Sequence, residues 1–500
     1  MHKRTLATAI AVTSASLVAG LAPAAVAAPA KPVKATSSTA KETKHVSDFN
    51  GDGYRDLVIQ EPGSYLDFRP GSIVVLYGSK KGVDSAHRQI IDQDTPGVPG
   101  TGERADRFGR TSVAGDYDGD GFTDLAIAAD GEDMSFGGTY RRNAGQTVIV
   151  WGGKKGLTKH GGVSVKQTTP TTIDVRRSYS LVAGDFNGDG TSDLATSDGG
   201  PAATDEVLYG PINRKTGAPK SIAGLGVPGP THYTVVDSGD VTGDGIGDLL
   251  VNAYGPSGYQ MTLRRGTKKG LAAPVSLKGA DGKPLPTARW GGIAIGDLDK
   301  DGYADMVLGN FGSRDDQVFT GRVMIIYGDR TGQSARPVQV ITQNTPGVPD
   351  EVEQDDNFGG SISVGDINAD GYADLAIGNN TEGVEGAEHT GQVTTLLGGP
   401  QGVTGEGAQA YDRGTQGVPE GRTPRDFFGT AVQLADLNGD QRADLVVGTG
   451  GSEEMHEGRI NILFNDGRGA ITGYGSHAYY AHNLGLRGGN MSGFSGSFGR

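Results

Sequence analysis

The chain has 500 residues, of which 85 are glycine and 23 are proline, and it contains no cysteine. This composition leaves little room for long helices and excludes disulfide bonds as cross-braces. The formal net charge is −14, and nothing in so acidic a chain favours binding of a nucleic acid.

The first 27 residues have the pattern of a secretory signal peptide. A basic start at residues 2–4 precedes an apolar stretch from about Ala9 to Ala22 and small residues up to Ala27. The apolar stretch is too short for a membrane anchor, and no other apolar run approaches membrane length. Residues 28–44 are small, polar and basic, which predicts a flexible linker. We therefore expect a secreted, extracellular protein whose folded part is residues 45–500.

From residue 48 onward the chain repeats a nine-residue loop of the form D-x-[DN]-x-D-G-x-x-D, followed each time by a short apolar run. The copies start 55 to 70 residues apart, a period that holds about four short strands, as in one propeller blade. We therefore predict an all-β fold, a seven-bladed β-propeller with calcium-binding hairpin loops. The seven copies begin at Asp48, Asp116, Asp185, Asp240, Asp297, Asp366 and Asp436.

The second copy shows the predicted unit most clearly. A short strand at 112–115 leads into the loop at 116–124, and a second strand follows at 125–129. After a connection, a third strand starts at Gly145 and ends in a turn at 154–157. Short runs rich in valine, isoleucine and tyrosine between glycines are typical of buried antiparallel strands. Blades of this kind must stack on one another, because none can cover its own faces.

Oxygen-bearing side chains recur at positions 1, 3, 5 and 9 of each loop, a spacing that suits a hard cation such as calcium. Position 12 is a residue of the following strand and never a glutamate, which excludes an EF-hand with its bidentate glutamate there. We therefore expect position 9 to close the site and position 7 to offer its backbone carbonyl. The candidate metal residues are Asp48, Asn50, Asp52, Tyr54 and Asp56; Asp116, Asp118, Asp120, Phe122 and Asp124; Asp185, Asn187, Asp189, Thr191 and Asp193; Asp240, Thr242, Asp244, Ile246 and Asp248; Asp297, Asp299, Asp301, Tyr303 and Asp305; Asp366, Asn368, Asp370, Tyr372 and Asp374; and Asp436, Asn438, Asp440, Arg442 and Asp444.

A plain hairpin turn is the structural alternative for these loops, since Asp, Asn and Gly all favour turns. Turn chemistry does not require a fourth carboxylate at a fixed offset in seven copies, so we predict up to seven bound Ca²⁺. Thr242 at position 3 and Gln441 at position 6 depart from the pattern, and we expect their sites to be the weakest. Most of the chain's acidity is then ligand charge.

A Phe-Gly pair precedes three of the loops, at Phe108-Gly109, Phe358-Gly359 and Phe428-Gly429. Together with the loops, these pairs resemble the FG-GAP repeat of integrin α-subunit propellers and their bacterial secreted relatives. The resemblance implies a seven-bladed propeller with calcium in the hairpin between the first and second strands of a blade. It also implies that ligands bind the opposite face. The chain ends in Phe498-Gly499, so we expect the C-terminus to complete the first blade.

Motifs of nucleotide-binding, serine-hydrolase and zinc-protease sites are absent from the sequence or interrupted by proline. We assign no catalytic and no cofactor-binding residues, and we expect a binding or adhesion module more than an enzyme. An extracellular enzyme that cleaves polysaccharides or esters, and a purely structural extracellular protein, remain the alternatives.

The longer connections of the repeats predict the ligand surface. We expect a monomer with no membrane span, whose partner is an extracellular protein or glycan bound on the face away from calcium. Solvated loops are the structural alternative for these connections. Their aromatic and arginine residues are Tyr65, Phe68, Arg69, Phe136, Tyr140, Arg141, Arg142, Arg314 and Phe319.

Overall fold

The computed structural model describes residues 47–63, 69–157, 161–168, 173–200, 205–225, 233–255, 258–279, 281–285, 291–310, 320–450, 458–486 and 498–499. All of them belong to one compact unit, Thr39–Arg500. The expected signal peptide and linker lie outside these residues. In the part of the chain so described, no helix has the length and apolar character needed to cross a membrane.

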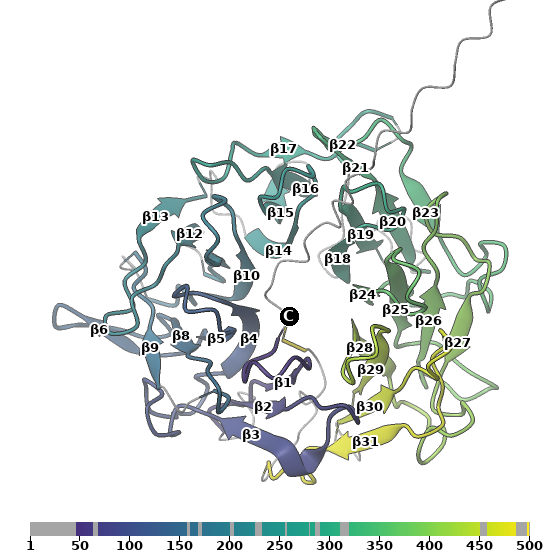
Figure 1. Cartoon of the computed structure of the whole chain (residues 1–500), viewed down its shortest axis with the longest axis horizontal. Coiled ribbons are helices and arrows are strands. Elements are labelled where there is room, and N and C mark those ends of the chain that lie inside the picture. Colours follow the sequence, from purple (N-terminus) through teal and green to yellow (C-terminus); the bar gives the residue numbers. More distant parts are fainter. Residues whose placement is uncertain are drawn as a thin grey trace, which may run out of the picture. The chain divides into compact units, whose positions relative to one another are not determined.

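The strands form seven antiparallel sheets, as the repeat count predicts, arranged as the blades of a ring (Figure 1). The first blade has three strands, β1 (Leu57–Glu61), β2 (Ser72–Leu76) and β3 (Arg88–Ile91), and the 3₁₀ helix η1 (Ser85–His87) precedes β3. The second is β4 (Phe108–Gly115), β5 (Asp124–Ala129), β8 (Gln146–Val150) and β9 (Gly162–Ser164). The third is β10 (Ser180–Gly184), β11 (Asp193–Ser197), β12 (Glu206–Tyr209) and β13 (Ser221–Gly224).

The remaining blades repeat the four-stranded plan. The fourth is β14 (Tyr233–Gly239), β15 (Asp248–Gly255), β16 (Gly258–Arg264) and β17 (Val275–Ser276), and the fifth is β18 (Ile293–Gly296), β19 (Asp305–Asn310), β20 (Arg322–Ile326) and β23 (Gln339–Ile341). The sixth is β24 (Ser361–Gly365), β25 (Asp374–Asn379), β26 (Gln392–Leu396) and β27 (Gln409–Tyr411), and the seventh is β28 (Phe428–Ala435), β29 (Asp444–Thr449), β30 (Arg459–Leu463) and β31 (His477–Tyr480).

The hydrophobic core consists of seven clusters, and each cluster lies between two neighbouring blades. Ile127 and Val148 of the second blade, for example, share a cluster with Val58 and Ile73 of the first. The other clusters join the remaining neighbours in the same way. One cluster joins the first and seventh blades, and it closes the ring. Stability therefore depends on stacking of blades, as expected for a repeat protein.

The end of the chain completes the first blade, as expected from its Phe-Gly pair. Phe498 forms an antiparallel bridge with Ile59, and Gly499 N donates to Val58 O at 3.1 Å. Phe498 is 9% exposed and belongs to the cluster between the first and seventh blades. The last described residues thus lie beside β1, where the other blades have their innermost strand (Figure 1).

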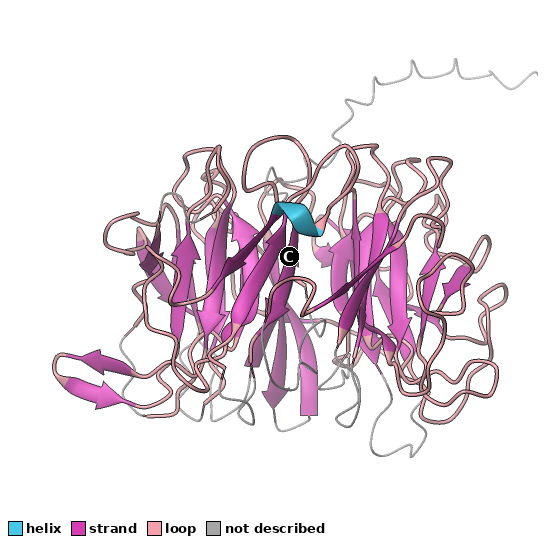
Figure 2. Ribbon diagram, turned by 90° about the horizontal axis from the view of Figure 1, so that it is seen from below, coloured by secondary structure: helices cyan, strands magenta, loops and turns pink. Residues whose placement is uncertain are grey.

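Two short ribbons lie outside the blades. The pair β21 (Gly328–Asp329) and β22 (Gly332–Gln333) follows β20, and the pair β6 (Met134–Phe136) and β7 (Thr139–Arg141) lies between β5 and β8. The sequence predicted only a connection at residues 130–145. Figure 2 shows that this connection is the ribbon projecting at the lower left of the molecule.

Candidate metal centres

The acidic loops occupy one face of the propeller. The loops after β4, β10, β14, β18, β24 and β28 each join the first and second strands of a blade, and the loop at 48–56 leads into β1. Because successive strands are antiparallel, the turns between third and fourth strands share this face. We call it the loop face. The connections between second and third strands, and those between blades, lie on the opposite face.

The first aspartate of each loop accepts hydrogen bonds from backbone amides in the middle of the same loop. In the first loop, Asp48 Oδ1 accepts from Gly51 N at 2.7 Å, and Asp48 Oδ2 accepts from Gly53 N at 2.9 Å. Position 5 acts in a similar way, because Asp52 Oδ1 accepts from Tyr54 N at 3.0 Å. Equivalent bonds recur in the other loops. These bonds hold each loop in a tight curl.

Position 6 requires a left-handed backbone in every loop. The glycines found there have φ between 82° and 92°. Gln441 of the seventh loop adopts φ 68° at the same position, although a side chain makes this conformation less favourable. The seventh loop therefore has the same curl as the others, at a conformational cost.

The position-9 aspartate of each loop is buried and links two hairpins. Asp124 is fully buried; its Oδ2 accepts from Tyr117 N at 3.1 Å in its own loop, and its Oδ1 accepts from Gly152 N at 2.8 Å after β8. Equivalent pairs of bonds are present in the other six loops, although in the fourth loop the donor within the loop is Thr242 N at position 3. Sequence reasoning assigned position 9 only to the metal. The structure gives it a second role, the bracing of the blade.

Burial makes these seven carboxylates costly to ionise. Desolvation raises the pKa of Asp56, Asp124 and Asp305 to about 8, even though the backbone hydrogen bonds lower it. The same cause raises the pKa of Asp193, Asp374 and Asp444 to about 7 and that of Asp248 to about 6. A neighbouring cation would offset this penalty, because an opposite charge favours the ionised form.

The loop side chains gather in a way that fits a hard cation. Carboxylate oxygens of Asp116, Asp118 and Asp124 lie within 4.8 Å of one another, and so do those of Asp297, Asp299 and Asp305. These two loops have aspartate at position 3. In the part of the chain that the structure describes, several buried candidate ligand atoms also have no hydrogen-bond partner, namely Asp299 Oδ1, Asp366 Oδ1 and Thr242 Oγ1. Unpartnered buried oxygens in an all-oxygen donor set are what Ca²⁺ would satisfy.

An arginine partly neutralises each of these two loops. Arg214, from the turn after β12, pairs with Asp118 at 2.9 Å and with Asp120 at 2.5 Å. Arg336 pairs with Asp299 at 2.8 Å. Each arginine offsets the charge of the fourth aspartate, so that these loops approach the charge of loops with asparagine or threonine at position 3. Sequence reasoning missed both arginines, because each lies far along the chain from its loop.

Neighbouring loops touch one another through positions 4 and 7. The Phe122 ring lies over Gly51, where an added Cβ would be 2.9 Å from Phe122 Cε1. Tyr54 lies over Gly439 in the same way, and it links the first loop to the seventh. Between the fifth and sixth loops, Lys300 Nζ lies 5.3 Å from the centre of the Tyr372 ring. The position-7 side chains therefore connect loops around the ring, while the role of their carbonyls as ligands stays a prediction.

The expected ligand residues on the opposite face are only partly described. Tyr140 is 61% exposed on the β6–β7 ribbon and donates a hydrogen bond to Asp133. Arg69 pairs with Glu61 at 3.2 Å, and Arg142 pairs with Asp174 at 2.9 Å. Tyr65, Phe68, Arg314 and Phe319 lie outside the described residues.

Comparison with known proteins bears on the repeats just described. Residues 108–150, 358–396 and 428–471 match the FG-GAP repeat family. The chain therefore carries three FG-GAP repeats. Each repeat contains one Phe-Gly pair, one acidic loop and the first three strands of the second, sixth or seventh blade. The resemblance expected from the sequence is confirmed.

Integrin α subunits are homologues of this FG-GAP chain. Mouse integrin alpha-IIb is 31% identical over 236 residues, which cover 42% of this chain and 21% of that protein. Drosophila melanogaster integrin alpha-PS2 is 29% identical over 238 residues, covering 43% and 16%. Human phosphatidylinositol-glycan-specific phospholipase D is 32% identical over 171 residues, covering 33% and 19%. The matches thus span about a fifth of the length of these relatives.

Among solved structures, the one titled "Structure of Dos1 propeller" aligns with 72% of this chain and 72% of its own, at a TM-score of 0.37 and 11% identity. The fold assignment depends on the seven sheets of the chain itself.

Proposed function

We propose that this FG-GAP propeller is a secreted extracellular binding or adhesion module whose acidic loops bind structural calcium. The observation that carries the calcium part is the buried position-9 aspartate, present in seven loops beside further carboxylates and beside unpartnered oxygens such as Asp299 Oδ1. The proposed ligands are positions 1, 3, 5, 7 and 9 of each loop, up to seven ions in total.

Calcium suits these loops better than other biological cations. All proposed donors are oxygens, from carboxylates, amides and backbone, and the loops are short and irregular, as Ca²⁺ tolerates and Mg²⁺ does not. Extracellular modules bind calcium with dissociation constants of about 0.1 to 1 mM. At about 1 mM Ca²⁺, a site of about 0.1 mM would stabilise the fold by about 1.4 kcal/mol, and seven sites by about 10 kcal/mol. That is comparable with the stability of a whole domain.

The homology to integrin α subunits supports a binding role, and the opposite face is the proposed place for the partner. The β6–β7 ribbon projects there and presents Tyr140, an exposed aromatic residue of the kind that dominates binding surfaces. We propose an extracellular protein or glycan as the partner of a monomeric propeller. Secretion through the predicted signal peptide is part of the proposal.

A binding assay with matched tyrosine variants tests this role. The mature protein is applied to glycan and cell-wall arrays with calcium present, and retention is compared for wild type, Tyr140→Ala and Tyr474→Ala. Both tyrosines are 61% exposed, but Tyr474 lies in the turn between β30 and β31 on the loop face. We expect Tyr140→Ala to weaken retention and Tyr474→Ala to leave it unchanged. Equal loss in both variants would place the partner elsewhere, and no retention of wild type would contradict the binding role.

An extracellular hydrolase is the second candidate, because a relative is named a phosphatidylinositol-glycan-specific phospholipase D. The chain aligns with only 19% of that protein. Turnover of a phospholipid, ester or glycan panel by the purified chain would favour the hydrolase, and retention without turnover would favour the binding module.

A further inference from the structure

Three related segments on the opposite face connect one blade to the next. They run from Gln93 to Asp106, from Gln343 to Asp356 and from Arg413 to Asp426, each with Gly-Val-Pro in the middle and Phe-Gly just after the end. They share a backbone geometry. The amides of Glu103, Glu353 and Thr423 donate to the aspartate that ends their segment, at 2.6, 2.7 and 2.9 Å. The three segments can therefore be compared position by position.

The second segment forms a carboxylate cluster away from the acidic loops. Oxygens of Glu353, Asp356 and Glu382 lie within 4.8 Å of one another. Asp356 is 4% exposed and Glu382 is 1% exposed, while Glu353 is at the surface. Within the described residues, none of the three pairs with a lysine, arginine or histidine. Three carboxylates are thus held together without a positive partner in that part of the chain.

Among the described residues, two buried oxygens at this cluster have no hydrogen-bond partner. Glu382 Oε2 accepts from Gln343 Nε2 at 2.7 Å and from Asn379 Nδ2 at 2.6 Å, whereas Glu382 Oε1 accepts nothing. Gln343, which is 1% exposed, donates its amide N–H to Glu382, but its carbonyl Oε1 is also unpartnered. A buried amide oxygen and a buried carboxylate oxygen left open beside two further carboxylates form a donor set for a cation.

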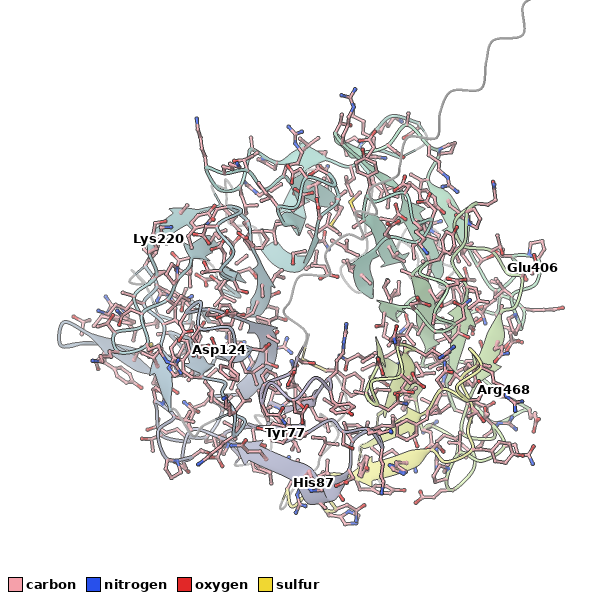
Figure 3. The ribbon with its side chains drawn as sticks, in the orientation of Figure 1. Tyr77, His87, Asp124, Lys220, Glu406 and Arg468 are labelled. Atoms are coloured by element: carbon pink, nitrogen blue, oxygen red, sulfur yellow. The ribbon has the colours of Figure 1, made fainter. Side chains whose placement is uncertain are left out.

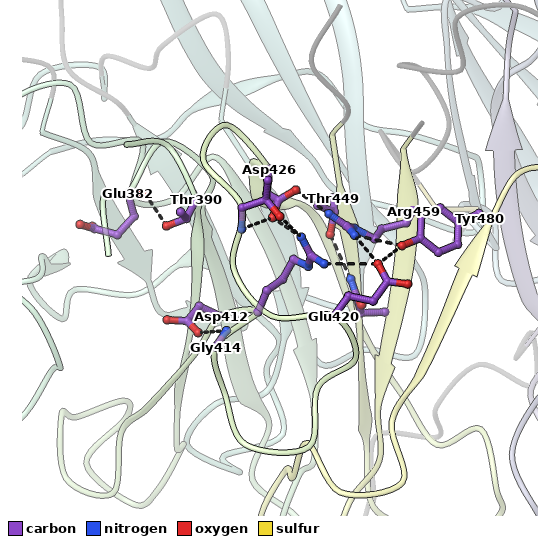
Figure 4. A network of polar contacts seen from close by, with 12 residues as sticks. Glu382, Thr390, Asp412, Gly414, Glu420, Asp426, Thr449, Arg459 and Tyr480 are labelled. Carbon is purple, nitrogen blue, oxygen red and sulfur yellow. Dashed lines mark hydrogen bonds and ion pairs between the residues drawn. The ribbon is translucent and has the colours of Figure 1, made fainter. Parts of the chain in front are cut away.

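The third segment has other residues at the positions of Gln343 and of the two glutamates. Arg413 stands at the position of Gln343, Thr423 at that of Glu353, and Ser452 at that of Glu382. The Arg413 side chain is 2% exposed and pairs with Asp426, the equivalent of Asp356. Arg459 Nη2 also contacts Asp426, at 2.5 Å, and the resulting network with Glu420 and Tyr480 is seen in Figure 4, with Glu382 on the neighbouring blade. Here the protein supplies its own buried cation.

The size and burial of the cluster decide which cation the second segment would take. Two oxygens on opposite sides of one Ca²⁺ are about 4.6 to 5.2 Å apart, twice the usual Ca–O distance. The oxygens within 4.8 Å of one another fit around a single ion of this size. A basic side chain of a partner would have to reach Glu382, which is almost wholly covered.

We propose that Glu353, Asp356 and Glu382, with the carbonyl oxygen of Gln343, bind a divalent cation of the calcium class on the opposite face. This site is separate from the acidic loops and does not depend on them. The first segment has the same residue types, Gln93, Glu103, Asp106 and Glu132, and Gln93 Nε2 donates to Glu132 Oε2 at 2.6 Å while Gln93 Oε1 has no partner. The ion would fix the connection between the fifth and sixth blades, close to the proposed partner surface.

Counting bound calcium in matched variants tests the proposal. Mature wild type, Glu353→Gln, Gln343→Arg and Glu351→Gln are dialysed against calcium chloride alone at about 0.1 mM, and bound calcium per chain is measured by mass spectrometry. Glu353 is exposed, so its variant should fold; Gln343→Arg copies the arginine of the third segment. The control, Glu351→Gln, removes the same charge from an exposed glutamate two residues away.

We expect Glu353→Gln and Gln343→Arg each to bind about one Ca²⁺ fewer than wild type, and Glu351→Gln to bind as many as wild type. Equal counts in all four proteins would overturn the proposal. If the acidic loops do not bind calcium, the result is different. Wild type would then bind only the ions of the opposite face, and Glu353→Gln would still bind one Ca²⁺ fewer than wild type.

Discussion

The ring of Tyr54 lies over Gly439, where an added Cβ would stand 2.8 Å from Tyr54 Cε1. Position 7 of the first loop thus rests on position 4 of the seventh, and the last loop of the chain contacts the first. The same relation joins Phe122 to Gly51 and Tyr303 to Gly243. Contacts of this kind therefore join neighbouring loops at several places around the ring, and a change in one of these loops should affect its neighbour.

Substitutions at two glycines of the first loop distinguish the effect of this contact on stability from the effect of backbone strain. Gly51 has φ 70° and lies under Phe122, whereas Gly53 has φ 92° and nothing within 4 Å of an added Cβ. Gly53→Ala should lower the free energy of unfolding by about 1 to 2 kcal/mol, the cost of a left-handed alanine. Gly51→Ala should cost about 1 to 3 kcal/mol more, because Phe122 must move. Urea unfolding with calcium present measures both, and equal losses would contradict the contact.

Replacement of the aspartate by asparagine should change the stability of the protein in different ways at positions 5 and 9 of a loop. Asp374 accepts amide hydrogen bonds on both oxygens, from Ile367 N at 2.7 Å and Gly398 N at 2.8 Å. Asp374→Asn leaves one buried backbone amide facing the NH₂ group of the new asparagine. It should therefore lower the free energy of unfolding by about 1 to 3 kcal/mol, both with and without calcium. Asp370→Asn keeps an acceptor for Tyr372 N and should lower stability only when calcium is present. Unfolding in calcium and in chelator compares the two variants.

The pH dependence of the calcium-free protein follows from the buried position-9 carboxylates. Their pKa is raised from 3.8 to between about 6 and 8, so the folded state binds more protons than the unfolded state across this range. The stability that these groups contribute in chelator is then fully present below about pH 3.8, the unfolded pKa, and it is lost as the pH rises through the folded pKa values of about 6 to 8. Glu382, whose pKa burial raises to about 8, acts in the same direction.

Saturating calcium should abolish this loss, because the ion holds the carboxylates ionised. Melting temperatures at pH 5 and pH 8, each with calcium and with chelator, test the sign. A chelated protein that becomes more stable from pH 5 to pH 8 would contradict the buried-carboxylate account.

Removal of an arginine should change calcium affinity in a predictable direction. Arg214 pairs with Asp118 and Asp120 in the second loop. Arg214→Gln should make that loop more negative, which raises its calcium affinity and lowers stability in chelator, so the calcium-induced rise in melting temperature becomes larger. Arg468→Gln is the control, because Arg468 is an exposed arginine at the outer edge of the seventh blade (Figure 3) and has no ion pair with an acidic loop among the described residues. A smaller rise in Arg214→Gln than in wild type would contradict the prediction.

The sequence predicted the features that repeat locally. The loops, the strands that follow them and the number of blades depend on residues that are close together in the sequence, as in the unit from Asp116 to Ala129. The bridge of Phe498 to Ile59 was also predictable, because its Phe-Gly pair copies that of Phe108.

The features that the sequence missed depend on residues brought together by the fold. Arg214 is 96 positions from Asp118, and Glu382 is 26 positions from Asp356. The second hydrogen bond of each position-9 aspartate goes to the end of the third strand, as from Gly152 N to Asp124, and loop spacing alone carries no sign of it. The repeat itself held a signal for the cluster at Glu382, since glutamate follows Phe108 and Phe358 at the same offset but serine follows Phe428.

The central claim is that calcium in the acidic loops braces the blades, and the melting temperature of the mature protein tests it most directly. Calorimetric scans are run in about 1 mM calcium, in excess chelator, and in chelator with magnesium. We expect a large fall in melting temperature in chelator, reversal by added calcium, and little rescue by magnesium, which needs more regular octahedral sites. An equal melting temperature in calcium and in chelator would contradict the claim.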